Sequence, residues 1–285
     1  MRQFPLLLLA VVGFLSSCDL VEDPYGPDTG GTGPVPVEGV RRRVLLEDFT
    51  GHRCIYCPEA TTIANQQAQI HGDDLVVVAL HVTNFYAAPV PPAGDGYYDN
   101  EFRTEAGNAY IGQWPASALP MGLVSRKAYN GSELLSRDAW SSAIAELIGQ
   151  EALMDVWVDD VQHNGTSGEV NATVKVSVAQ DLGGAAHSMV VYLVEDSIIG
   201  WQSDANSTPS EIPDYVHRHV LRGTMNGTWG QSVLIGTESV GDTLSFSLPP
   251  YTLSSDWNAG QISLVAYVYN TATYEVMQVT ERHLQ

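Results

Sequence analysis

Two cysteines three positions apart, Cys54 and Cys57, are the residues with the most evident chemistry. A pair at this spacing, placed where a strand ends and a helix begins, can cycle between dithiol and disulfide. The helix N-terminus stabilises a thiolate at Cys54, and His52 and Arg53 add positive charge. Cys54 is therefore the predicted nucleophile that attacks a substrate disulfide, and Cys57 is predicted to resolve the mixed disulfide.

Two other interpretations of this pair stay open. The cysteines can form a static disulfide that only holds the turn, or they can be half of a zinc site. A second ligand pair is missing nearby, so we predict no metal and no cofactor. Glu47 and Asp48 lie just upstream, and one of them is a proton acceptor near Cys57 if it points inward; otherwise both belong to a solvated strand end.

The surrounding pattern predicts the elements that position the cysteines. Residues 44–49 are predicted to be a short strand, and residues 58–70 are predicted to be a helix with Pro58 in its first turn. Residues 75–82 form a continuous apolar run that is typical of a buried parallel strand. Strand, helix and strand over this length predict a βαβ unit. Helices are predicted at 98–110 and 132–149.

A proline completes the predicted site. In thioredoxins a proline enters an apolar strand opposite the CxxC, the bond before it is cis, and the adjacent backbone pairs with the substrate. Residues 114–126 resemble this arrangement, and we predict that Leu119–Pro120 is the cis bond, with Trp114–Pro115 as the competitor. Pro120 therefore joins the predicted catalytic residues, and residues 43–150 are predicted to be an α/β thioredoxin-like domain.

From residue 151 the apolar period changes to two, most clearly over residues 170–178. About seven short strands with turns between them predict an all-β immunoglobulin-like sandwich over residues 151–285. The further strands are predicted at 153–161, 188–195, 215–222, 243–248, 261–269 and 275–281.

Histidines and tryptophans of this half have alternative interpretations. His217 and His219 are predicted to share one strand face, with a structural role favoured over metal binding because a third ligand is missing. Trp201, Trp229 and Trp257 either pack in the fold or form a platform for stacking a sugar.

The N-terminus carries targeting signals. Residues 4–15 form an apolar run that is shorter than the roughly 20 residues of a transmembrane helix. Residues 1–17 are therefore predicted to be a signal peptide. The run ends in Leu-Ser-Ser before Cys18, which resembles a bacterial lipobox and implies acylation of Cys18. Residues 18–42 are rich in proline and glycine and are predicted to be a flexible tether.

The net charge of the chain limits the classes of partner that it can bind. The 285 residues contain 13 Lys and Arg against 33 Asp and Glu, a net charge of −20. Nucleic acid is excluded because phosphate binding needs clustered cations. Binding to the membrane is predicted to depend on the lipid anchor, since an acidic protein has no electrostatic attraction to anionic head groups.

Two blocks of sequence resemble one protein family. They are Glu47-Asp48-Phe49-Thr50-Gly51-His52-Arg53-Cys54-Ile55-Tyr56-Cys57-Pro58-Glu59-Ala60 and Val216-His217-Arg218-His219-Val220-Leu221-Arg222-Gly223. Both are similar to the twenty-eight-kilodalton outer-membrane lipoprotein family of Bacteroidota. The resemblance implies a lipid-anchored thioredoxin-like domain followed by a β-sandwich. It also implies a location at the outer membrane, on the periplasmic or the cell-surface side.

Two functions from different classes follow. The first is a thiol–disulfide oxidoreductase of the cell envelope that acts on protein disulfides. The second is a non-enzymatic surface lipoprotein that binds a protein or a glycan through the β-sandwich, with the thioredoxin-like domain as a scaffold. Enzymatic thioredoxins differ from this chain at the residue before Cys54, which is Arg53 here, and by a proline between the cysteines.

Overall fold

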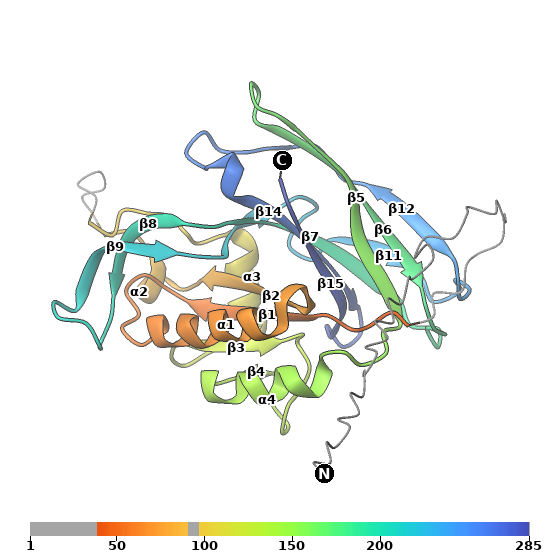
Figure 1. Cartoon of the computed structure of the whole chain (residues 1–285), viewed down its shortest axis with the longest axis horizontal. Coiled ribbons are helices and arrows are strands. Elements are labelled where there is room, and N and C mark those ends of the chain that lie inside the picture. The colour runs from red at the N-terminus through yellow and green to blue at the C-terminus, as the bar shows by residue number, and fades with distance from the viewer. Residues whose placement is uncertain (1–38, 91–96, 285) are drawn as a thin grey trace, which may run out of the picture. The chain divides into compact units, whose positions relative to one another are not determined.

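The computed structural model describes residues 39–90 and 97–284, and a nine-stranded sheet runs through this part of the chain (Figure 1). In spatial order its strands are β15 (Val276–His283), β14 (Ile262–Asn270), β7 (His187–Glu195), β10 (Val220–Thr224), β2 (Leu75–His81), β1 (Val44–Thr50), β3 (Met121–Val124) and β4 (Leu134–Leu135), and β11 (Gln231–Leu234) also pairs with β7. The protein is therefore rich in β-structure, with few helices.

The predicted βαβ unit is confirmed. β1 and β2 are parallel neighbours with Val44 opposite Leu75, and α1 (Cys57–His71) crosses between them. Both strands are buried at every position, which agrees with the apolar run of β2. In β1 the buried positions include Glu47 and Asp48. β3 lies antiparallel on the other side of β1.

Helices cover both faces of this part of the sheet. α1 and α4 (Arg137–Leu147) pack on one face, where Ala60 and Trp140 share a core with Leu46. α3 (Glu105–Gln113) packs on the opposite face through Tyr110. α3 begins later than predicted because the hydroxyl of Thr104 accepts a hydrogen bond from the amide of Gly107 and caps the helix there.

A second, smaller sheet covers one face of the large sheet at its other end, where β7 and β14 lie. It contains β5 (Met154–Asn164), β6 (Glu169–Val178), β12 (Thr243–Ser247) and β13 (Tyr251–Thr252). The central strand β7 is buried on both faces. Val191 packs toward the small sheet, whereas Tyr192 faces the core that contains the cysteines. The period-two pattern is thus confirmed for the small sheet. β7 has a continuous apolar run instead, because both of its faces are buried.

The predicted strand over 215–222 is two strands. β8 (Ile198–Ser203) and β9 (Glu211–His217) form a separate hairpin, and β10 begins only at Val220. Between β9 and β10, His219 has a positive φ of 55°, which breaks the strand. The prediction that His217 and His219 share one strand face is therefore wrong.

Strands from both predicted domains share the large sheet, since β10 pairs in parallel with β2 through Val220 and Ala79. The boundary at residue 150 stays a prediction. The last residues of the predicted tether are held, because Arg42 is buried and pairs with Glu275 at 2.9 Å. Cys18 and the signal peptide lie outside the described residues. Among the helices that the structure describes, none is long and apolar enough to span a membrane.

Candidate redox site

Cys54 and Cys57 form a disulfide at the start of α1. Cys54 lies in the turn after β1, and Cys57 is the first residue of the helix. Each cysteine is only 1% exposed, although Ile55 and Tyr56 between them are 44% and 51% exposed. The loop is therefore at the surface while both sulfur atoms point inward.

The loop needs glycine at position 51. A Cβ there would lie 2.5 Å from the carbonyl oxygen of Tyr86, closer than real Cβ atoms come to backbone. This close approach lets the amide of Arg53 donate to the same Tyr86 carbonyl at 3.0 Å. Within the loop, the amide of Cys54 donates to the carbonyl of Gly51 at 2.9 Å. The local sequence thus folds the loop against α2 (Asn84–Ala87).

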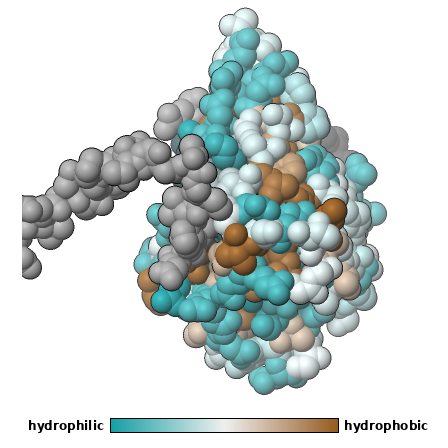
Figure 2. Space-filling view, turned by 90° about the vertical axis from the view of Figure 1, so that its right-hand side faces the viewer, coloured by the Kyte–Doolittle hydropathy of each residue, from teal (hydrophilic) through white to brown (hydrophobic). Residues whose placement is uncertain are grey.

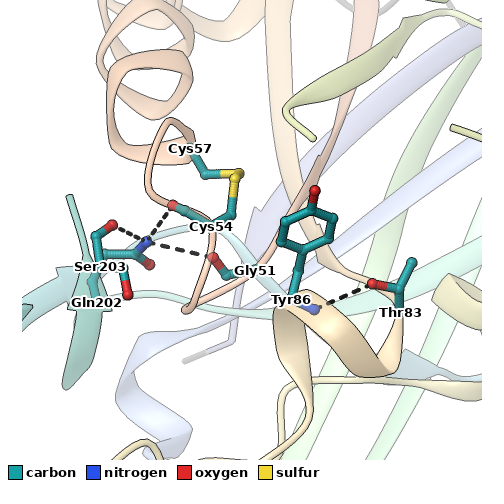
Figure 3. Close-up of a disulfide and its surroundings, with 7 residues drawn as sticks. All are labelled: Gly51, Cys54, Cys57, Thr83, Tyr86, Gln202 and Ser203. Atoms are coloured by element: carbon teal, nitrogen blue, oxygen red, sulfur yellow. Dashed lines mark hydrogen bonds between the residues drawn. A yellow bond between two sulfur atoms is a disulfide. The ribbon is translucent and has the colours of Figure 1, made fainter. Parts of the chain in front are cut away.

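The β8–β9 hairpin holds the other side of the loop. The Gln202 side chain donates to the carbonyl of Cys54 at 3.1 Å and to that of Gly51 at 3.4 Å (Figure 3). The amide of Ser203 donates to the carbonyl of His52, and the amide of Ala205 to that of Ile55, both at 2.8 Å. Sequence reasoning missed Gln202, because it lies 148 residues from Cys54 in the chain and no motif marks it.

Asp48 points inward beneath α1. It lies on the same face of β1 as Val44 and Leu46, which pack in one core with Ala60 of the helix. One of its oxygen atoms is buried without a hydrogen-bond partner. Burial raises the pKa of Asp48 to about 8, so this carboxyl is protonated at neutral pH. The interpretation of this stretch as a solvated strand end is wrong.

Tyr215 of β9 lies close enough to Asp48 for the two groups to interact electrostatically. Burial raises the pKa of Tyr215, and the charge of Asp48 adds to the rise, while a hydrogen bond with Thr61 of α1 opposes it. The hairpin therefore reaches beneath α1 as well as around the cysteine loop.

Glu47 faces the opposite side of β1 and is fully paired. It receives two hydrogen bonds of 2.7 Å from the buried guanidinium of Arg126, and a third of 2.7 Å from the hydroxyl of Tyr192. Tyr267 accepts from the same guanidinium at 2.8 Å, and the rings of Tyr110 and Tyr267 lie against it. The sequence contained no signal for this cluster, because its members come from five distant segments: β1, α3, the turn after β3, β7 and β14.

Three buried histidines lie next to the cysteine loop. The ring of His81 is 6.4 Å from His52 and 5.6 Å from His217, and Phe102 contacts all three. Burial lowers the pKa of His52 and of His217 to about 4 and that of His81 well below its usual value, so all three are neutral at pH 7. Within residues 39–90 and 97–284, no histidine, cysteine and carboxylate side chains are grouped to hold a metal ion.

The predicted cis bond before Pro120 is confirmed. Among the described residues the cis bonds are Leu119–Pro120 and Thr208–Pro209, so Trp114–Pro115 is not one of them. Pro120 is buried and directly precedes β3, and Leu119 packs in the same core as both cysteines. The three tryptophans considered for a sugar platform each pack against a different ring: Trp201 on Tyr97, Trp229 on Tyr110 and Trp257 on Tyr251.

Comparison with solved structures finds matches at low sequence identity. HBP35 of Porphyromonas gingivalis is 14% identical, with a TM-score of 0.61 over 86% of this chain and 76% of that chain. A domain of the outer membrane lipoprotein Omp28 from Porphyromonas gingivalis is 22% identical over 47% of this chain and 89% of its own, with a TM-score of 0.33. No curated protein matches the chain.

A family model gives the assignment. The model of outer membrane protein Omp28 matches residues 107–285, which is more than half of the chain. The match agrees with the family that the two sequence blocks resemble. The chain therefore belongs to the Omp28 family of outer membrane proteins, which places it in the outer membrane.

Proposed function

We propose that this chain is a lipid-anchored outer-membrane protein whose N-terminal half is thioredoxin-like and exchanges disulfides at Cys54 and Cys57. The observation that carries the proposal is the buried carboxyl of Asp48, one oxygen of which has no hydrogen-bond partner, beneath the helix that starts at the disulfide. A carboxyl that stays protonated at neutral pH is a proton donor for a leaving thiolate.

The arrangement of elements supports a thioredoxin-like half. A parallel β1–α1–β2 unit carries the disulfide at its helix start, and β3 lies antiparallel beside β1, directly after the cis bond of Pro120. α1 and α4 cover one face of these strands and α3 the other. An immunoglobulin-like sandwich for the C-terminal half is supported by the small sheet, which packs on one face of β7 and β14.

The exchange consists of two displacements. A thiolate of a partner dithiol attacks Sγ of Cys54, the protein's S–S bond breaks, and Cys57 leaves with the electron pair and takes a proton from Asp48. The partner's second thiolate then attacks the partner sulfur of the mixed disulfide, which forms the partner disulfide and releases Cys54 as a thiolate. Two electrons pass from the partner to the cysteine pair. In the reverse direction Cys54 attacks a substrate disulfide, Cys57 resolves it, and Asp48 takes the proton.

The anchor is part of the proposal. Cys18 is acylated after cleavage of residues 1–17, and several acyl chains hold the protein stably at the membrane, where one chain gives only marginal binding. Labelling with radioactive palmitate tests this point. We expect label in the unmodified chain and none in Cys18→Ser, and label retained in that variant contradicts acylation of Cys18.

The exchange is tested by the reduction potential of the Cys54–Cys57 pair in glutathione buffers. We expect a potential above about −300 mV, in the range of working oxidoreductases. Cys54→Ser is expected to abolish insulin reduction, and Cys57→Ser is expected to trap a mixed disulfide with the substrate, with Cys18→Ser as the control that keeps both properties. A lower potential, together with no trapped complex, means that the bond is structural.

The 1% exposure of both cysteines favours a second candidate function. In it the disulfide is static and the protein binds a protein or a glycan through the β-sandwich. On the face in Figure 2, hydrophobic side chains form small patches separated by hydrophilic ones, so a polar ligand suits it better than a large apolar one. Binding to panels of glycans and envelope proteins should then be unchanged in Cys54→Ser and Cys57→Ser, and binding lost in both at unchanged stability rejects this candidate.

A further inference from the structure

The sulfur atoms are covered from one side of their loop. Gln202 approaches the loop from the side away from the disulfide, whereas the ring of Tyr86 lies on the side to which the sulfur atoms point (Figure 3). Tyr86 also packs against the core that contains both cysteines. Of the side chains drawn in Figure 3, Tyr86 is the one on the sulfur side, and it is half-buried, whereas Ile55 and Tyr56 of the loop are exposed.

The cover rests on a small element. α2 has four residues, and three bonds join its backbone to the cysteine loop. The amide of Arg53 donates to the carbonyl of Tyr86, the Arg53 guanidinium donates to that of Asn84, and Nε2 of His52 lies 3.2 Å from that of Ala88. The neighbouring Phe85 is 76% exposed and does not anchor the helix in the core. A short element with few buried contacts belongs to the part of a fold that opens at low free-energy cost.

Backbone strain lies at the start of this element. Thr83 has φ 66° and ψ 149°, at the edge of a region that is essentially restricted to glycine. A β-branched residue there is an outlier. The Thr83 hydroxyl accepts a hydrogen bond from the amide of Tyr86 at 3.3 Å, so the strained residue also holds the covering residue in place. Strain of this kind is typical of clamps and switch segments.

We propose that Tyr86 controls access to the disulfide: α2 turns away about Thr83 before a thiolate reaches Sγ of Cys54. The inference rests on the proposed exchange, and it adds which kind of thiol can reach the disulfide. A small free thiol meets a covered disulfide and reacts slowly, whereas a polypeptide dithiol that displaces α2 gains access. Tyr86 is thus a residue that determines specificity, and it takes no part in the electron transfer.

The test is the second-order rate constant for reduction of Cys54–Cys57 in the full chain by dithiothreitol, followed by thiol alkylation and mass measurement. Tyr86→Ala is expected to raise this rate constant at least tenfold. Tyr86→Phe keeps the ring and should react as the unmodified chain does, and Phe85→Ala is the matched control on the same helix. Tyr86→Leu, which keeps an apolar contact with the core, should react at least threefold faster and decides the question if Tyr86→Ala does not fold.

Equal rate constants in the folded Tyr86→Ala or Tyr86→Leu variant and the unmodified chain overturn the inference, as does Tyr86→Phe reacting as fast as Tyr86→Ala. These outcomes are separate from those of the proposed exchange. If the chain turns over a protein disulfide but Tyr86 has no effect on the rate constant, only the access role fails. If Tyr86→Ala reacts faster but no variant turns over a protein disulfide, the cover is real and the exchange is not.

Discussion

Glu47 and Asp48 are neighbours on β1, both are buried, and they face opposite sides of the sheet. Glu47 receives three hydrogen bonds, and the charge of Arg126 balances its own. Asp48 has no cation beside it, and burial raises its pKa to about 8. Two carboxyls of similar chemistry therefore have opposite roles, because a paired buried charge holds structure, whereas an unpaired one holds a proton.

The largest expected effect comes from breaking the paired side. Arg126→Met leaves Glu47 and the hydroxyls of Tyr192 and Tyr267 without their cation in the core. Removing one partner of a buried pair destabilises a protein by about 3–5 kcal/mol. Urea unfolding of Arg126→Met should show a loss of this size. The double variant Glu47→Leu, Arg126→Met should recover part of it, and a double variant that is less stable than the single one contradicts this view of the pair.

The unpaired carboxyl of Asp48 should make the free energy of unfolding depend on pH. The pKa of Asp48 is raised in the folded state, so its contribution is complete below the unfolded pKa of about 3.9 and is lost as pH rises toward 8. Between pH 5 and pH 7.5 the loss is about 3 kcal/mol. The difference in unfolding free energy between the unmodified chain and Asp48→Asn should change by that amount over this range. A difference that is constant with pH means that Asp48 is ionised in the fold.

The histidines beside the loop should act in the opposite direction. Burial lowers the pKa of His217 to about 4, so its neutral form is stable in the fold, and stability is lost as pH falls from about 6.5 toward 4. From pH 6 to pH 4.5 the loss is about 2 kcal/mol for this residue. His217→Asn should flatten the acid limb by that amount, measured by urea unfolding at several pH values. The half-buried His163 of β5 provides the control, and His163→Asn should leave the limb unchanged.

The smallest expected effect comes from the hairpin that braces the loop. Gln202→Ala removes the side-chain hydrogen bonds to the carbonyls of Cys54 and Gly51, at a cost of about 1–2 kcal/mol. Each carbonyl then keeps only the bond that it accepts from an amide within the loop. Amide hydrogen exchange at Ser203 and Ala205 should accelerate with it. Asn206→Ala at the exposed hairpin tip should change stability by less than about 0.5 kcal/mol. Equal effects of the two substitutions contradict a bracing role for Gln202.

Much of the N-terminal half could be predicted because its signals are local. The short strand β1, the continuous apolar run of β2 and the position of Pro58 in the first turn of the helix between them are all signals carried by neighbouring residues. The cis bond at Pro120 was predicted from its place before an apolar strand. The break at His219 was missed, because residues 215–222 contain no glycine or proline to mark it and only the backbone conformation of His219 divides the strand.

The amino-acid sequence by itself determined that a cysteine pair lies where β1 ends and α1 begins, since strand and helix periods and the helix start are properties of adjacent residues. Only the tertiary structure decided what surrounds that pair. Gln202 braces the loop from 148 residues away, and the ring of Tyr86 lies on the side to which the sulfur atoms point. Arg126 pairs with Glu47 and leaves Asp48 without a cation. The protonation state of a buried carboxyl depends on which side chains the fold brings across the sheet, and short-range spacing carries no record of that.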